Sequence, residues 1–214
     1  SYRRAIATQS GSPLSYFNCG VLLQRQGKKQ EALEAYDAAI ARVADFADAH
    51  LNRTMVLNDL FRFEDALMAG EVALRLKPGS ALAYNNLGNA LTGIGQVRES
   101  LAFYQQAQRL DPEYVDAQWN LAVNYLALGD FEKGYPLYEC RWKTALQKQH
   151  VHHFKQPLWL GDASLEGKTI YVYHEQGYGD FIQKVRFIPL LLPRGARVLL
   201  VCFPALIPLI EYSM

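Results

Sequence analysis

The feature that most constrains the fold of this chain is an internal repeat with a period of about 34 residues. When the sequence is aligned with itself at that shift, an asparagine recurs in one column, at Asn18, Asn52, Asn86 and Asn120. A second column holds only small or short residues: Gly20, Thr54, Gly88 and Ala122. A repeat of this size is typical of arrays in which each unit buries its apolar face against its neighbours. The alternative is a plain helical bundle with accidental periodicity.

Further columns describe the packing within each unit. A third small column holds Ala32, Ala66, Ser100 and Gly134. An aromatic column holds Tyr36, Tyr104 and Tyr138, with Gly70 as its exception. Small residues allow two helix backbones to approach closely, and a large ring fills the hollow beside them. Gly27, Gly95 and Gly129 lie where a first helix ends and a positive φ is expected. The pattern predicts two antiparallel helices per unit.

These columns closely resemble the tetratricopeptide repeat, most clearly at Asn85–Leu91, Gly95, Tyr104, Ala107 and Asp111-Pro112. The resemblance covers residues 13 to 147 and implies a mainly α fold, a right-handed superhelix of antiparallel helix pairs. The expected units are 13–46, 47–80, 81–114 and 115–147. Tyr2 and Ala5 align with Tyr36 and Ala39. We therefore expect residues 1–12 to be the end of an earlier unit and Ser1 to be a cut edge.

In such an array the first helix of each unit lines the concave face, and the asparagine column lies there. An amide side chain offers donors and an acceptor, which suits the main chain of an extended peptide. A similar asparagine ladder occurs in the protein O-linked N-acetylglucosamine transferase. The alternative is that asparagine serves only local helix packing. Neighbouring candidate contact residues are Phe17, Leu51, Asn85, Asn89 and Trp119. This mixture is more apolar than charged, which argues against recognition of a ligand carboxylate.

The fourth unit departs from the pattern, because Pro136 falls inside its second helix and should bend or restart it. Residues 148–168 are expected to be a connector. His150, His152 and His153 cluster there, and two interpretations are open, a metal site or a polar linker. No acidic or thiol partner has suitable spacing, so we favour the linker and expect no metal.

From Thr169 the period changes to that of alternating strands and helices. A strand is expected at 169–174, a helix from Asp180 to Leu192 that is closed by Gly195, a strand at 197–203, and a helix opened by Pro204. This order predicts the start of a Rossmann-like α/β domain over 169–214, incomplete at two strands. The loop with Gly177 and Gly179 is not a dinucleotide fingerprint, because Ile182 stands where the third glycine is needed.

Trp159-x-Gly161, the run from His174 to Gln183 and Arg186-Phe187 resemble bacterial repeat proteins fused to a heptosyltransferase-like domain of the GT-B fold. The resemblance covers about residues 157–214. It implies that the loop after the first strand faces the catalytic cleft and that Asp180 is the base that activates an acceptor hydroxyl.

Two other expectations concern the same loop. Asp180 with Gln183 also matches a capping box, which would make its role structural. His174 and Glu175 are further candidates at the strand end, together with Gly177 and Gly179. Because the domain is incomplete, we expect the fragment to be inactive and without a cofactor, with a nucleotide sugar as the donor in the full-length protein.

Composition narrows the class of partner. The net charge is +1 over 214 residues, so no bulk field indicates nucleic acid or an anionic membrane. The three cysteines form no CxxC pair, and a reducing cytoplasm is expected. No membrane span or signal peptide is predicted. The function predicted is a peptide-binding module at the N-terminus of a glycosyltransferase. The alternative is a non-catalytic scaffold, which includes self-association through exposed helix faces. Whether the parent chain is an enzyme stays open.

Overall fold

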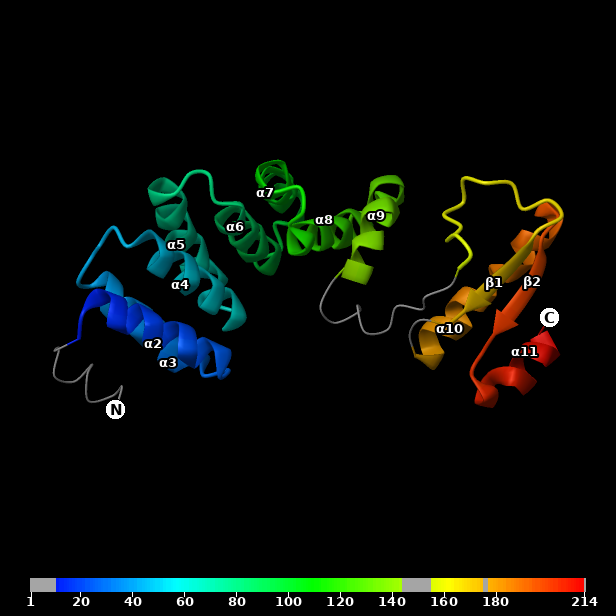
Figure 1. Ribbon diagram of the computed structural model, residues 1–214, viewed down its shortest axis with the longest axis horizontal. Helices are drawn as coiled ribbons and strands as arrows, with labels where there is room; N and C mark the ends of the chain where they lie inside the picture. Colours follow the sequence, from blue (N-terminus) through cyan, green and yellow to red (C-terminus); the bar gives the residue numbers. More distant parts are fainter. Residues whose placement is uncertain (1–10, 144–154, 175–176, 214) are drawn as a thin grey trace. The chain divides into compact units, whose positions relative to one another are not determined.

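The computed structural model describes residues 11–143, 155–174 and 177–213 (Figure 1). The chain divides into two compact units, Ser1–His152 and His153–Met214. The expected partial unit at 1–12, the boundary at 147 and 148, and the histidine cluster lie wholly or partly outside the described residues.

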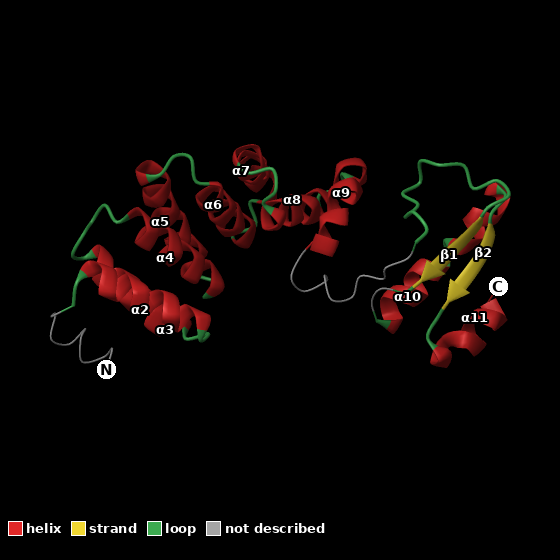
Figure 2. Cartoon of the chain, in the orientation of Figure 1, coloured by secondary structure: helices red, strands yellow, loops and turns green. Residues whose placement is uncertain are grey.

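The first unit is built from consecutive antiparallel helix pairs, followed by one short 3-10 helix (Figure 2). The first helices of the pairs are α2 (Pro13–Arg25), α4 (Ala47–Asp59), α6 (Ala81–Gly93) and α8 (Val115–Ala127). The second helices are α3 (Lys29–Ile40), α5 (Phe63–Leu76), α7 (Val97–Leu110) and α9 (Phe131–Tyr138). The 3-10 helix η1 (Glu139–Lys143) follows α9 directly, three residues after Pro136. The mainly α fold predicted from the repeat is confirmed.

Small residues and tyrosine rings pack together in the first and third helix pairs, as the columns predicted. A Cβ atom added at Gly88 would lie 2.6 Å from the Tyr104 ring, and one at Gly20 would lie 2.6 Å from the Tyr36 ring. Both rings are almost fully buried. In the second unit of the repeat, where Gly70 replaces the tyrosine, the side chain of Leu87 from the next unit fills the space. The exception in the aromatic column is therefore compensated by a neighbour.

The turns between paired helices show one backbone exception. Gly27, Gly95 and Gly129 adopt φ values of 74°, 85° and 79°, as the sequence predicted for these positions. The equivalent residue in the second repeat, between α4 and α5, is Phe61, with φ of 58° and 79% of its surface exposed. A bulky side chain in this left-handed region costs about 1–2 kcal/mol. Its ring has an edge contact with Phe63, with centroids 6.0 Å apart.

The second compact unit of the chain, His153–Met214, contains a two-stranded parallel sheet, and we call it the α/β unit. Strands β1 (Thr169–Tyr173) and β2 (Arg197–Val201) pair from Thr169 with Arg197 to Tyr173 with Val201. Between the strands lie α10 (Tyr178–Val185) and the 3-10 helix η3 (Ile188–Arg194), and after them η4 (Pro204–Leu206) and α11 (Ile207–Ser213). Phe181 of α10 packs with Leu206 and Ile210 against the sheet residue Leu200.

Two expectations about the second unit need correction. The single helix expected from Asp180 to Leu192 is two elements, because α10 ends at Val185 and a 3-10 helix with Pro189 follows. The strands are also shorter than expected and end at Tyr173 and Val201. Gly195 does end the helical segment, with φ of 76°.

We predict that Gly88→Ala destabilises the array by up to about 2 kcal/mol. The new methyl group overpacks the interface with Tyr104 at a cost of about 1–3 kcal/mol, and the gain of about 1 kcal/mol in helix propensity offsets part of that cost. Urea unfolding followed by circular dichroism measures the difference. Gly79→Ala is the matched control, since a Cβ there meets no atom within 4 Å and stability should hardly change. Equal midpoints for the two variants would contradict the packing argument.

We also predict that Phe61→Gly raises stability by roughly 1 kcal/mol, because glycine adopts a positive φ without the steric penalty. The reverse change is tested with Gly27→Ala. The added Cβ meets no atom within 4 Å, so the change in stability reports only the cost of a positive φ for a residue with a side chain. Thermal melting should move upward for the first variant and downward for the second. A lower melting temperature for Phe61→Gly would mean that the contact with Phe63 outweighs the strain.

Candidate peptide-binding face

The first helices of successive pairs lie next to one another, since α4 contacts both α2 and α6, and α6 contacts α8. Residues four apart on a helix share one side of it, so Phe17 and Val21 lie on the same side of α2, next to Asn18. The equivalent residues of α4, α6 and α8, at intervals of 34, continue this surface from one repeat to the next. We call this surface the inner face. Its exposed or half-buried members are Phe17, Asn18, Val21, Asn52, Met55, Asn89, Trp119, Asn120 and Val123.

The predicted asparagine ladder is not uniform. Asn18 is exposed, whereas Asn52 and Asn120 are half-buried. Asn86 is only 3% exposed, and its main-chain oxygen accepts a hydrogen bond of 2.8 Å from the Asn58 amide. Asn85 is equally buried, at 3%. These two side chains lie inside the array, so a bound peptide would meet the other three asparagines of the column.

The other predicted contact residues also divide by burial. Leu51 is 4% exposed and packs with Ala73 and Ala83 in the interior. Phe17 is half-buried, with its ring centroid 5.9 Å from that of Tyr36 and 5.0 Å from that of Phe46. Trp119 is half-buried against Tyr138, with centroids 5.0 Å apart. Phe17 and Trp119 thus present aromatic surface held firmly in place by neighbouring rings.

The hydrogen bonds between α6 and α8 use some polar atoms of Asn89 and Asn120 and leave one polar atom of each without a partner among the described residues. The Asn120 amide donates both of its hydrogens, to Oδ1 of Asn85 at 3.0 Å and Oδ1 of Asn89 at 2.9 Å. Oδ1 of Asn89 also accepts from the Tyr104 hydroxyl at 2.9 Å. Among the hydrogen bonds of the described residues, Oδ1 of Asn120 and Nδ2 of Asn89 have no partner. A free acceptor and a free donor therefore lie side by side on the inner face.

Burial raises the pKa of the tyrosine hydroxyls of this network further above neutral pH. Desolvation raises the pKa of Tyr104 to about 12, against smaller opposing effects of hydrogen bonds from Thr92 and Asn124. Desolvation likewise raises the pKa of Tyr36 to about 12. The Tyr36 hydroxyl donates to Gln24 at 2.9 Å and accepts from Asn52 at 3.4 Å. At neutral pH both hydroxyls remain donors that orient amides of the first helices.

Sequence reasoning missed part of this network. Thr92 bonds the Tyr104 hydroxyl at 3.1 Å, and Asn124 donates to Thr92 at 2.9 Å and to Ser100 at 2.8 Å. Asn124 falls in the column of Val56 and Ala90, where a polar residue breaks an apolar pattern. That break is the signal that could have identified it.

The α/β unit has a separate pocket at the carboxyl end of β1. Its lining includes His174, Asp180 and Lys184 together with Val172, Phe181 and other apolar residues. His174 stacks on Phe203, with ring centroids 3.8 Å apart. Sequence reasoning missed Lys184, which lies one helical turn after Asp180.

The capping-box interpretation of Asp180 is wrong. Helix α10 begins at Tyr178, its N-cap is Gly177, and Asp180 is the third residue of the helix, with an exposed side chain. A Cβ at Gly177 or Gly179 would meet no atom within 4 Å, so packing does not require glycine at either position. Glu175 lies outside the described residues.

Over the described part of the chain, no three His, Cys, Asp or Glu side chains are grouped so that they could hold a metal ion. None of the described helices combines the length and the apolar character needed to cross a membrane.

Comparison with known proteins identifies the repeat. Residues 20–81 and residues 81–114 each match a family described as the tetratricopeptide repeat. Protein FlbA of Caulobacter vibrioides is 26% identical over 187 residues, covering 70% of this chain and 31% of that protein. The Hsp70-Hsp90 organizing protein of Triticum aestivum is 34% identical over 86 residues, 40% of this chain and 15% of that protein.

A further relative is the probable UDP-N-acetylglucosamine–peptide N-acetylglucosaminyltransferase SPINDLY of Arabidopsis thaliana. It is 28% identical over 116 residues, 54% of this chain and 12% of that protein. The chain thus spans at most 31% of the length of these three relatives.

Solved structures share the fold of the array. MamA 41-end from Desulfovibrio magneticus RS-1 is 22% identical with a TM-score of 0.55, over 66% of this chain and 78% of that one. The first TPR of Spaghetti (RPAP3), bound to HSP90 peptide SRMEEVD, is 23% identical with a TM-score of 0.53, over 55% of this chain and 94% of that one. The helix pairs and the tyrosine packing agree with these matches, and residues 20–114 of the array resemble tetratricopeptide repeats.

Proposed function

We propose that the inner face binds an extended polypeptide segment of a partner protein. The observation that carries this proposal is the pairing of a free donor on Asn89 with a free acceptor on Asn120. A peptide group presents one N–H and one C=O, so it matches such a pair without regard to its side chain. Half-buried apolar residues such as Val21 and Met55 lie in the same column as Asn89 and would contact the side chains of the segment.

Similar proteins support a peptide as the occupant. The TPR domain of Spaghetti was solved with a bound HSP90 peptide, and its fold resembles this array. The Hsp70-Hsp90 organizing protein is named for the proteins that it assembles. The four first helices, at spacings of roughly 8–10 Å, span roughly 30 Å. An extended segment of about ten residues covers that length.

We predict that Asn89→Ala combined with Asn120→Ala weakens peptide binding at least several-fold, since each lost hydrogen bond is worth about 1 kcal/mol. Peptides of about ten residues would be selected from a random library on the wild-type array. Their dissociation constants for each variant would then be measured by fluorescence anisotropy.

The matched control is Gln105→Ala, which removes an internal amide hydrogen bond of 2.7 Å to Tyr125 from a second helix. It tests whether loss of an internal hydrogen bond alone weakens binding, and thermal melting of each variant checks that the array stays folded. Failure to select any peptide, or equal binding by the double variant and the wild type, would contradict the proposal.

A second candidate function is glycosyl transfer by the full-length protein, with Asp180 as the general base. It is favoured by the pocket at the end of β1, where an exposed carboxylate and the His174 ring share one cavity. Asp180 would take the proton of an acceptor hydroxyl as its oxygen attacks the anomeric carbon, and the nucleoside diphosphate would leave. The name of SPINDLY includes a transfer of N-acetylglucosamine to peptides, which agrees with repeats that present an acceptor.

We predict that Asp180→Asn lowers the rate of sugar-nucleotide turnover by the full-length protein at least about 100-fold, the usual contribution of a general base. Asp162→Asn, at an exposed loop position outside the pocket, is the control and should leave the rate unchanged. Equal rates for wild type and Asp180→Asn would exclude Asp180 as the base.

A further inference from the structure

We infer that the inner face selects uncharged or basic segments from within a chain and rejects peptides that depend on acidic side chains or a free C-terminal carboxylate. This inference rests on the proposed peptide binding and concerns the chemistry of the bound segment. It follows from the charges that the four first helices carry.

Basic residues are nearly absent from the first helices. Helices α6 and α8 contain no lysine or arginine, and α2 and α4 contain one each, Arg25 and Arg53. Acidic residues are Asp48, Asp59 and Asp116. The four helices together therefore carry one more negative than positive charge.

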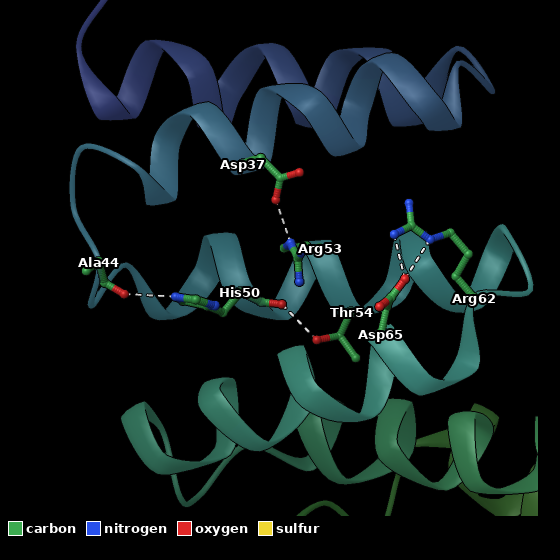
Figure 3. A network of polar contacts seen from close by, with 7 residues as sticks. All are labelled: Asp37, Ala44, His50, Arg53, Thr54, Arg62 and Asp65. Atoms are coloured by element: carbon green, nitrogen blue, oxygen red, sulfur yellow. Dashed lines mark hydrogen bonds and ion pairs between the residues drawn. The ribbon is translucent and has the colours of Figure 1, made fainter.

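Neither arginine is available to a ligand in the middle of the inner face. Arg53 is paired with Asp37 of α3, with 2.6 Å between Nε and Oδ1, and only about a quarter of its side chain is exposed (Figure 3). Arg25 is exposed on the same side of α2 as Val21, but it is the last residue of the first of the four helices and therefore lies at the edge of the inner face. A carboxylate bound between the helices would thus lose its water without gaining a cation, which is unfavourable.

The acidic residues are less fully compensated. Asp48 lies 3.3 Å from the ammonium group of Lys77, whereas the ion pairs of the described residues include none to Asp116 at the start of α8. The negative charge of Asp116 affects the pKa of the neighbouring Tyr114. Burial is the main cause that raises its pKa to about 12, and the carboxylates of Asp116 and Asp111 contribute in the same direction. An anionic segment that passes Asn120 would be repelled here, and a basic side chain would be attracted.

The amide pair of Asn89 and Asn120 points to the same occupant. Its free donor and acceptor match a peptide group, which every residue inside a chain has on both sides. Recognition of a terminal carboxylate uses charged donors such as arginine, which form stronger hydrogen bonds. Neither Asn89 nor Asn120 carries a charge, and the nearest arginine of a first helix, Arg53, is paired with Asp37. The inner face is therefore built for the main chain and for apolar side chains.

The test uses one random pool of peptides of about ten residues, synthesised with free C-terminal carboxylates and, separately, with amidated C-termini. Each pool is passed over the wild-type array, and the bound fraction is sequenced by mass spectrometry. We expect aspartate and glutamate to be depleted about tenfold in the bound fraction, equivalent to about 1.4 kcal/mol. Amidation should leave the bound sequences unchanged.

Two variants test whether charge causes the selection. Asn18→Lys with Asn52→Lys places cations on the inner face and should move the bound fraction toward acidic peptides. Gln30→Lys with Ala102→Lys adds the same charge at exposed positions of the second helices α3 and α7 and should retain the wild-type preference. Acidic peptides in the wild-type fraction, or a need for the free carboxylate, would overturn this inference while peptide binding stands. An empty bound fraction for both pools would overturn peptide binding itself.

Discussion

The packing of a tyrosine ring of the second helix against a glycine of the first helix is the interaction on which the array depends. At Gly20 and Gly88 the first helix has no Cβ, and the rings of Tyr36 and Tyr104 occupy the space. The contact fixes the separation of the two helices in the first and third pairs and brings each hydroxyl to the amide side chains of the first helices. Packing and polar recognition are therefore coupled, because the same ring that fills the core also orients the candidate binding residues.

The second repeat shows how the array tolerates departures from this rule. Gly70 stands where tyrosine is expected, and Leu87 from the next unit enters the hollow. Phe61 stands where glycine is expected and holds a left-handed backbone conformation with an exposed ring. The first departure is compensated by packing across the boundary between repeats. The second is balanced only by the edge contact with Phe63, so the strain remains local to the turn.

The inner face is mostly uncharged because charged side chains of the first helices pair with residues outside this face. Arg53 is paired with Asp37 of α3, and Asp48 lies close to Lys77 at the end of α5, so two charges of the first helices are directed away from the inner face. The inner face then consists mainly of amides, aromatic rings and aliphatic side chains, with Asp116 as an acidic residue without an ion pair among those of the described residues. Such a surface binds through main-chain hydrogen bonds and apolar contact, both of which are insensitive to the exact sequence of a partner. This composition is the basis for the proposed preference for uncharged or basic segments.

The sequence by itself determined the helix pairs, the glycine turns and the tyrosine packing, because these features repeat at a fixed interval and each column has one physical cause. It also indicated the parallel order of the α/β unit, since strand, helix and strand alternate in composition. The tertiary structure alone decided which asparagines are accessible. Asn52, Asn86 and Asn120 share a column, yet Asn86 is buried and the other two are half-buried. Burial depends on the neighbours of each helix in adjacent repeats, and a column records only the position within one repeat. The free donor on Asn89 and the free acceptor on Asn120 likewise arise from contacts between α6 and α8, which no single unit contains.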